Sequence, residues 1–402
     1  MKVFFERIVR VRETYFDSPV SPGFVSLYTG KLIIEIAGGL IGIFLPVFLY
    51  ELFDRDFRLV MLYYGAASLL YLLVLSLGTQ FLNTFGFRRA LRTSVFVGAA
   101  FFASFIFMHP ENIWYLIPLS LVLLTLFRVF YWVPYHTGFA SFTDPYNRGR
   151  QVSIVYAAQL LINVATPIIA GFLITRFGFE VLFVIALTLY LVSGIPYATL
   201  PKTYETYSWT LRRYFREVFS RRRRALMLSH VAYGADNLVG LVVWPIFIFE
   251  LLDGNFFGVG LISTTITGAS VVLQLFVGKY VDGSVPKERI LGWGSAFYAF
   301  GWVVKIFIAT AFQIFIAGVY HNITKIFTRT PFETLSYEIA ADGGHYVDEY
   351  TVLKETALNV GKVLMASLAA LVSFFFPLQW VFAIAAGAAL AFNLIRVYQR
   401  RF

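Results

Sequence analysis

The chain has 402 residues, of which 58% are hydrophobic, 19% aromatic and only 14% charged, and its formal net charge is +10. A soluble domain carries about a quarter charged residues, so most of this chain must lie in lipid and not in water. Cysteine is absent, which excludes disulfides and thiol catalysis. No two of the five histidines have metal-ligand spacing, so neither a metal nor another cofactor is expected.

The first 23 residues are basic and amphipathic, and we expect them to form a cytoplasmic segment. Phe4, Ile8, Val11 and Tyr15 would share one helical face. Such a helix could lie on the inner leaflet, or the segment could be a solvated tether. The apolar run that follows is longer than the core of a cleavable signal, so it is expected to stay as a membrane span.

Apolar stretches of about 20 residues, enough to cross a bilayer as a helix, follow along the chain. They lie at 24–52, 57–80, 91–108, 113–136, 152–175 and 180–200, and then near 225–251, 256–279, 289–309, 311–332, 351–376 and 379–397. The predicted fold is an all-α polytopic membrane protein with twelve transmembrane helices. We expect a six-helix bundle at 24–200, a basic cytoplasmic linker at 201–224 and a second six-helix bundle at 225–402.

The basic residues support this topology. With both termini cytoplasmic, 24 of the 33 Lys and Arg residues fall in cytoplasmic segments and three in external loops. This bias follows the positive-inside rule for the inner (plasma) membrane, and it makes nucleic-acid binding a poor explanation of the charge. In the linker, Leu211, Phe215 and Val218 share a helical face among arginines. That helix could bind anionic lipid of the inner leaflet, or the segment could be a solvated tether.

A nine-residue phrase occurs twice: PVFLYELFD at Pro46–Asp54 and PIFIFELLD at Pro245–Asp253. The repeat extends further, because Arg128 precedes Pro134 by six residues as Lys325 precedes Pro331. Six spans per half return the chain to its starting side, so the repeat is parallel. In membrane proteins built in this way, the functional site usually lies at the interface between the two halves, which indicates a transporter.

Together these features resemble the major facilitator superfamily. The residues that carry the resemblance are Gly278-Lys-Tyr-Val-Asp282-Gly283, Gly86-Phe-Arg-Arg89, Arg128, Arg148-Gly-Arg150 and Thr166-Pro-Ile-Ile-Ala-Gly171. The resemblance implies two six-helix bundles that rock against each other, with the first, fourth, seventh and tenth helices lining a central cavity. It implies conformational roles for Gly278, Asp282, Arg148, Arg150, Pro167 and Gly171, and a monomeric protein.

Charged residues inside spans are costly and usually functional. Together with the polar residues that share their helical faces, they form our candidate substrate or ion site: Lys31, Glu35, Arg128, Trp132, Asn163, Asp236, Asn237, His321, Lys325, Glu355, Asn359 and Lys362. Lys305 lies in a span expected to be peripheral, so we predict that it reaches outward to the membrane surface.

We predict two ion pairs at equivalent places, Glu35–Arg128 and Asp236–Lys325; alternatively, such charges only fix helix register. The slight excess of cations favours an anionic or zwitterionic substrate, and the aromatic residues would suit an amphipathic one. A buried carboxylate can couple transport to protons because its pKa is adjustable. The candidate proton-binding groups are the carboxylates of Glu35, Asp236 and Glu355 and the imidazole of His321. Sodium is the alternative coupling ion.

No phosphate-binding G-x-x-x-x-G-K-[ST] motif occurs, so solute or ion gradients must drive any transport. The main expectation is therefore a secondary active transporter of a small solute, and not an enzyme. A lipid or drug exporter of the same fold is the alternative. A membrane-embedded transferase would need a metal site in the acidic stretch Glu333–Glu349, which we interpret as a solvated loop. A receptor or scaffold that lost transport is a further possibility.

Overall fold

The computed structural model describes residues 21–142, 148–202, 207–278, 286–342 and 347–399, which are helices joined by short connections. Ten helical segments of this described part are long and apolar enough to span a membrane. Two further helices, α13 (Lys287–Lys305) and α14 (Ala311–Asp342), contain more charged residues and complete the twelve predicted spans. The predicted all-α membrane fold is confirmed.

The first half of the chain forms spans one to six. Its helices are α2 (Pro22–Ile41), α3 (Phe44–Leu52), α4 (Phe57–Phe85), α5 (Phe87–Ile106), α6 (Ile113–Phe142), α7 (Arg148–Phe177) and α8 (Phe179–Ala198). The linker contains α9 (Leu211–Val218) and the short helix η1 (Arg221–Arg223).

The second half forms spans seven to twelve. Besides α13 and α14, its helices are α10 (Arg224–Leu238), the π-helix η2 (Val239–Val243), α11 (Trp244–Leu251), α12 (Phe256–Gly278), α15 (Val347–Val372), η3 (Leu378–Trp380), α16 (Val381–Ala391) and α17 (Leu394–Gln399).

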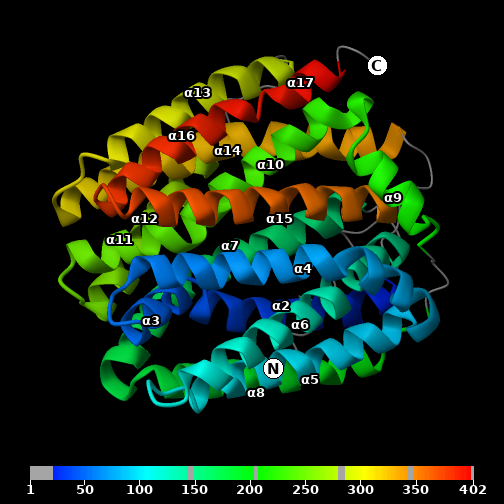
Figure 1. Ribbon diagram of the computed structural model, residues 1–402, viewed down its shortest axis with the longest axis horizontal. Coiled ribbons are helices and arrows are strands. Elements are labelled where there is room, and N and C mark those ends of the chain that lie inside the picture. The colour runs from blue at the N-terminus through cyan, green and yellow to red at the C-terminus, as the bar shows by residue number, and fades with distance from the viewer. Residues whose placement is uncertain (1–20, 143–147, 203–206, 279–285, 343–346, 400–402) are drawn as a thin grey trace, which may run out of the picture.

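The two halves lie side by side with their helices nearly parallel (Figure 1). Within the first half α2 packs on α8, and α5 packs on α6 and α8; within the second, α10 packs on α15, and α13 on α14 and α16. The halves meet along two helix pairs, α7 with α12 and α4 with α15. Pro167 and Gly171, which we expected to act in conformational change, lie at the first of these contacts.

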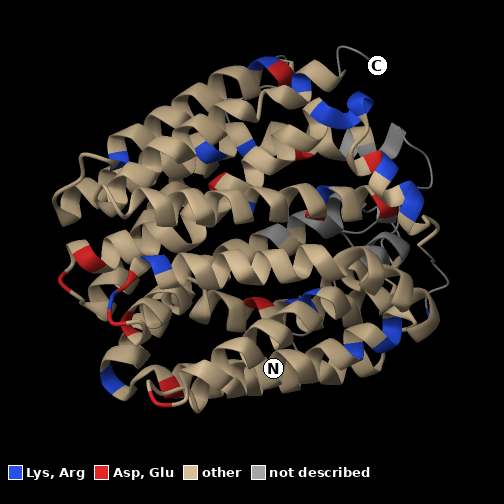
Figure 2. Cartoon of the chain, viewed as in Figure 1, with Lys and Arg blue, Asp and Glu red and all other residues tan. Residues whose placement is uncertain are grey.

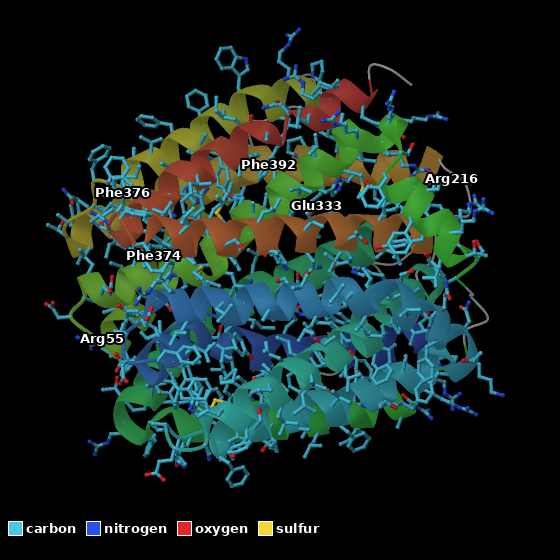
Figure 3. The ribbon with its side chains drawn as sticks, in the orientation of Figure 1. Arg55, Arg216, Glu333, Phe374, Phe376 and Phe392 are labelled. Carbon is cyan, nitrogen blue, oxygen red and sulfur yellow. The ribbon has the colours of Figure 1, made fainter. Side chains whose placement is uncertain are left out.

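One end of the molecule carries the repeated phrase and the other carries the linker. We call these the repeat end, marked by Asp54 and Asp253, and the linker end, marked by α9. Figure 2 shows Lys and Arg gathered at the linker end and several Asp and Glu at the repeat end. Arg216 and Arg55 lie at opposite ends of the molecule (Figure 3). This separation agrees with the charge bias read from the sequence.

The repeated phrase folds the same way twice. Asp54 and Asp253 both have a φ of 51°, and the residues after them, Arg55 and Gly254, have φ of 62° and 80°. The Arg55 N–H donates to the Tyr50 carbonyl at 2.8 Å, and the Gly254 N–H to the Phe249 carbonyl at 3.0 Å. Two consecutive left-handed residues thus end α3 and α11 alike. The left-handed conformation causes no steric strain at Gly254, which has no Cβ, but it is strained at Arg55, which has one.

The first and seventh spans are also irregular at equivalent positions. The first breaks at Gly42 and Ile43, between α2 and α3, and the seventh contains the π-helix η2. The offset between Pro46 and Pro245 places Gly42 opposite Leu241, inside η2. Interruptions of this kind often occur at functional sites in helical proteins, and this one borders the cavity described below.

The linker bridges both halves at the linker end. The Asn83 amide group exchanges two hydrogen bonds with the Tyr207 backbone, at 2.7 and 2.8 Å. The Glu349 carboxylate of α15 accepts from the Ser208 N–H at 3.0 Å and from the Ser208 hydroxyl. The predicted linker helix exists as α9, but its buried residue is Tyr214, and Phe215 is exposed. The two expectations for this helix, lipid binding or tethering, stay predictions.

The acidic stretch is not a solvated loop in its described part. Glu333 lies within α14 and forms an ion pair with Lys354 at 2.7 Å, and Glu349 is buried at the start of α15. The loop prediction was wrong because both helices extend beyond the apolar sequence and pack there. Nearly all of the amphipathic segment 1–23 and Asp282 lie outside the described residues. Arg148 is the first residue of α7, and Gly278 is the last residue of α12. The side chains of Arg148 and Arg150 are not among those that the structure describes.

A polar cavity in the second half

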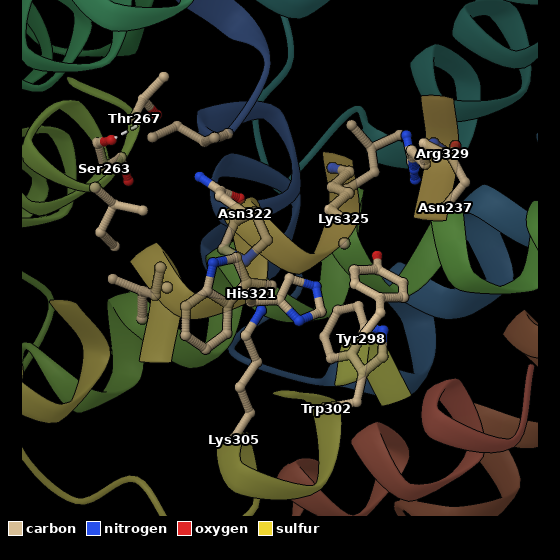
Figure 4. A pocket seen from close by; sticks show the side chains of 18 residues that line it. Asn237, Ser263, Thr267, Tyr298, Trp302, Lys305, His321, Asn322, Lys325 and Arg329 are labelled. Atoms are coloured by element: carbon tan, nitrogen blue, oxygen red, sulfur yellow. Dashed lines mark hydrogen bonds between the residues drawn. The ribbon is translucent and has the colours of Figure 1, made fainter. Parts of the chain in front are cut away.

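A cavity of about 280 Å³ lies inside the second half, next to the break in the first span. Its walls come from α10, η2, α11, α12, α13 and α14, and Ile43 of the first half also contributes. Figure 4 labels its polar lining residues, which are Asn237, Ser263, Thr267, Tyr298, Trp302, Lys305, His321, Asn322, Lys325 and Arg329. Of the candidate site residues, Asn237, His321 and Lys325 line this cavity.

Asp236 is the buried carboxylate beside this cavity. Its Oδ1 accepts a hydrogen bond from Trp302 Nε1 at 2.7 Å, and its Oδ2 accepts from the Tyr298 hydroxyl at 3.1 Å. Arg329 Nη2 lies 3.3 Å from the same Oδ2 and completes the set. Asp236 therefore pairs with Arg329 and not with Lys325 as we predicted. The reason is that Arg329, one helical turn further along α14, reaches the carboxylate that Tyr298 and Trp302 of α13 hold in place.

The prediction that Lys305 reaches outward to the membrane surface was wrong. Lys305 is 2% exposed, and its Nζ lies 3.7 Å from the ring centroid of Trp244 and 4.2 Å from that of Trp302. The side chain points into the second half towards His321 (Figure 4), and does not reach outward to the membrane surface. Two tryptophan faces attract the ammonium group, so α13 presents this residue to the cavity.

His321 and Lys325 stand one turn apart on α14 above these rings. The His321 ring lies 4.4 Å from the Tyr298 ring and 4.3 Å from the Trp302 ring, centroid to centroid. Its Nδ1 is buried and makes no hydrogen bond with the described residues. Within the same described part, Lys325 has neither a hydrogen bond nor an ion pair. Two polar groups of the cavity therefore have unused hydrogen-bonding capacity.

The first half holds a second charged site. Lys31 forms an ion pair with Glu35, one turn further along α2, and Gln159 Nε2 of α7 lies 3.3 Å from Glu35 Oε1. Glu35 therefore pairs with Lys31 and not with Arg128 as predicted, because the two residues share one face of the same helix. The Lys31 ammonium is surrounded by rings of α6, with Nζ 5.6, 5.1 and 5.2 Å from the centroids of Tyr131, Trp132 and Tyr135.

Arg128 faces the contact between α4, α6 and α15. Its guanidinium carbon lies 5.7 Å from the Tyr71 ring centroid, and its Nη1 is buried with no hydrogen-bond partner in the described part of the chain. On α15, Asn359 is 1% exposed, and its amide donates to the Glu355 carbonyl at 2.8 Å. Neither Glu355 nor Lys362 lines the described cavity. Asn163 is exposed on α7 and also lies outside it.

The candidate residues thus fall into three groups and not one: the cavity, the Lys31–Glu35 site and the Arg128 region. Sequence analysis did not place Lys305, Tyr298, Trp302 or Arg329 in the site. A charge within an apolar span was the available signal for Lys305, and the spacing His321, Lys325, Arg329 was the signal for Arg329. Among the described residues no three His, Asp or Glu side chains gather as metal ligands.

Comparison with known proteins supports the assignment of fold and family. A family model for the Major Facilitator Superfamily matches residues 27–229, just over half of the chain. An uncharacterized protein of Bacillus subtilis (strain 168), YqgE, is 24% identical over 248 residues, covering 58% of this chain and 56% of that protein. The chain therefore aligns with little more than half the length of this relative.

A crystal structure of a mutant peptide transporter, POT, in complex with alafosfalin has a similar fold. Its TM-score is 0.66 at 12% sequence identity, and the match covers 94% of both chains. At this identity the likeness concerns the fold alone. The family match indicates a membrane transport protein. Because the family model spans half of its residues and the whole fold agrees, this chain belongs to the Major Facilitator Superfamily.

Proposed function

We propose that this protein is a secondary active transporter that moves a small solute across the cell membrane by alternating access, with both termini in the cytoplasm. The observation that carries the proposal is the cavity, which places lysines, a histidine and amides inside an otherwise apolar helical assembly. Such groups are costly in a membrane, and a passing polar solute would make use of them. The sequence contains no nucleotide-binding loop, so a gradient would supply the energy.

The contacts between the halves at the repeat end support a conformation closed on that side. The Tyr50 hydroxyl of α3 donates to the Glu250 carboxylate of α11. A Cβ added to Gly65 would lie 3.2 Å from the Ala366 Cβ, so α4 and α15 are in close contact there. In our proposal the halves 24–200 and 225–402 rock against each other, and the repeat-end parts of the α3–α11 and α4–α15 contacts separate in the outward-open state.

The linker and the N-terminal segment would stay on the cytoplasmic side, with their basic residues near anionic lipid. We propose protons as the coupling ion, with Glu35 as the group that carries them, because its carboxylate is held between Lys31 and Gln159 and a change in its charge would alter that contact. Sodium is the alternative ion. The protein would act as a monomer.

Transport can be tested by exchange. Purified protein in liposomes loaded with an isotope-labelled metabolite extract should release specific compounds when unlabelled extract is added outside, as measured by mass spectrometry. Protein-free liposomes give the background. Release of no compound above that background, in either membrane orientation and at pH 6 and 8 alike, would contradict the proposal.

Alternating access can be tested with a disulfide, because the natural chain has no cysteine. The double variant Gly65→Cys/Ala366→Cys places two Cβ atoms 3.2 Å apart, slightly closer than the roughly 3.5–4.5 Å usual in a disulfide. Oxidation should block exchange, and a reductant should restore it. Each single variant should be insensitive to oxidant. Full exchange in a cross-linked double variant would rule out movement at this contact.

A further inference from the structure

The cavity of the second half contains more positive than negative charge. Lys305, Lys325 and Arg329 line it, and Asp236 is the carboxylate that contacts its lining residues. One carboxylate therefore faces three basic side chains within the described part of this site. Charged side chains inside a membrane usually pair with one another or face a cavity, and they mark substrate or ion pathways.

Asp236 is already satisfied and cannot compensate the lysines. Its two oxygens accept from Trp302, Tyr298 and Arg329, at 2.7, 3.1 and 3.3 Å. Neither Lys305 nor Lys325 is within ion-pair distance of a carboxylate among the described residues. The Asp236–Arg329 pair is neutral, so the two lysines account for the excess.

The two lysines are held in different ways. Lys305 is buried, and its ammonium group lies over the faces of Trp244 and Trp302 without an ion pair or hydrogen bond to any described residue. Aromatic faces attract a cation, but they cannot accept its hydrogen bonds in the way that an anionic oxygen does. A lysine at the last residue of a helix could instead extend to the membrane surface. Its inward direction makes the ammonium group part of the cavity lining, where it can donate hydrogen bonds to a ligand.

The remainder of the lining is neutral and polar. Asn237 and Asn322 supply amide groups, and Ser263 and Thr267 supply hydroxyls on the α12 wall (Figure 4). These groups would bind hydroxyl, amide or carbonyl groups of a solute without adding charge. A volume of about 280 Å³ holds a small metabolite and no polymer.

We propose that this cavity binds the anionic group of the transported solute, a carboxylate or phosphate, between Lys305 and Lys325. The class of substrate is therefore a small organic or inorganic anion. This inference rests on the proposed transport function and deepens it. The Lys31–Glu35 site of the first half, where the lysine is already paired within its own helix, would contact the uncharged part of the solute or take part in coupling.

The test measures binding and not transport, so that the two proposals can fail separately. Trp244 and Trp302 flank Lys305, and an anion placed there should change their fluorescence. The purified full-length protein in uncharged detergent is titrated with phosphate, sulfate, acetate, succinate, citrate and benzoate at constant ionic strength and in a fixed background of sodium chloride. For the cationic comparison, choline replaces sodium at the same chloride concentration. At least one anion should give a saturable change, and choline should give none.

Variants locate the site. Lys305→Met and Lys325→Met should each weaken binding of that anion about 10- to 100-fold, since a hydrogen bond to a charged group is lost. Lys305→Arg keeps the charge and should restore binding to within a few fold, which shows that a loss in Lys305→Met is not misfolding. Lys202→Met removes an exposed lysine of the linker and should bind as the natural protein does.

Two results would overturn the inference: no saturable response to any of the six anions, or equal affinity in the natural protein, Lys305→Met and Lys325→Met. If exchange then identifies a neutral or cationic solute, transport stands and the anion site fails. If an anion binds through both lysines but liposomes exchange nothing, the site stands and the transport function fails.

Discussion

The hydroxyl of Tyr50 donates a hydrogen bond to the carboxylate of Glu250, and this bond joins the two copies of the repeated phrase across the halves of the protein. Glu250 occupies the position of Glu51 in the first copy, and Tyr50 occupies that of Phe249 in the second. The pair is thus asymmetric: the tyrosine that the second copy lacks binds the glutamate that both copies have. It lies where α3 and α11 meet.

Replacing Tyr50 with Phe should therefore favour opening of the repeat end. A hydrogen bond to a charged group contributes about 1.5–3 kcal/mol, so the ratio of open to closed molecules should rise about tenfold or more. Spin labels at Leu59→Cys and Phe257→Cys, one on each half, would report a longer distance by double electron–electron resonance. Tyr115→Phe, at an 80% exposed position, is the control. An unchanged distance distribution would show that this bond does not hold the end closed.

Glu35→Gln tests proton coupling. The substitution keeps the size of the side chain and removes its charge, so Lys31 loses its ion-pair partner and Gln159 keeps an acceptor. We expect uptake driven by a pH gradient to stop and solute exchange at equal pH to continue, both measured in liposomes. Glu51→Gln, on the exposed pair with Arg55, should leave both activities intact. Undiminished pH-driven uptake in Glu35→Gln would remove this residue as the proton carrier.

Asp236→Asn should destabilise the second half. Removing one member of a buried ion pair leaves the other charge uncompensated, which costs about 3–5 kcal/mol, and here Arg329 is the residue left. Thermal unfolding in detergent should show a clear fall in midpoint. The double variant Asp236→Asn/Arg329→Gln should recover part of the loss.

The matched control is Asp56→Asn, which breaks an exposed pair with Arg58 at the start of α4. Exposed pairs contribute about 0–1 kcal/mol, so its midpoint should hardly change. If the two single variants unfold at the same temperature, Asp236 is not a structural anchor of the second half.

Gly361→Ala should disrupt the packing of α10 on α15. A Cβ at this position would lie 1.9 Å from the Val231 carbonyl oxygen, and the reciprocal glycine, Gly234, is 2.0 Å from the Leu358 carbonyl by the same measure. The helices must separate to admit the methyl group, and overpacking of this kind costs about 1–3 kcal/mol. A chemical-denaturation midpoint in detergent measures the loss.

Gly387→Ala makes the same substitution at a position where the added methyl group has free space. An added Cβ there meets no atom within 4 Å, and the residue lies inside α16. Alanine in a helix interior is more favourable than glycine by about 0.5–1 kcal/mol, so this variant should be slightly more stable. A stability loss in Gly387→Ala equal to that in Gly361→Ala would show that the close α10–α15 contact is not the cause of the loss.

The repeat was predictable because five of its nine positions are identical and the other four exchange one apolar residue for another, and the backbone has the same conformation in both copies. Asp54 and Asp253 share a φ of 51°, and the hydrogen bonds that close each turn join equivalent residues. The span count was predictable because length and apolarity determine what can cross a bilayer. The side-chain pairs were not. Asp236 pairs with Arg329 because Tyr298 and Trp302 approach from α13, a neighbour that no spacing along α10 or α14 specifies.

Lys305 illustrates the same division between sequence and structure. Its charge inside a span was visible, but the direction of a side chain on a helix surrounded by apolar residues depends on which neighbours face it. Here the neighbours are Trp244 and Trp302, the former from another span. Sequence alone determined the membrane class, the helices and the internal repeat, because those depend on local apolarity and length. Only the tertiary structure decided which charges meet, because pairing depends on how each helix is rotated against its neighbours.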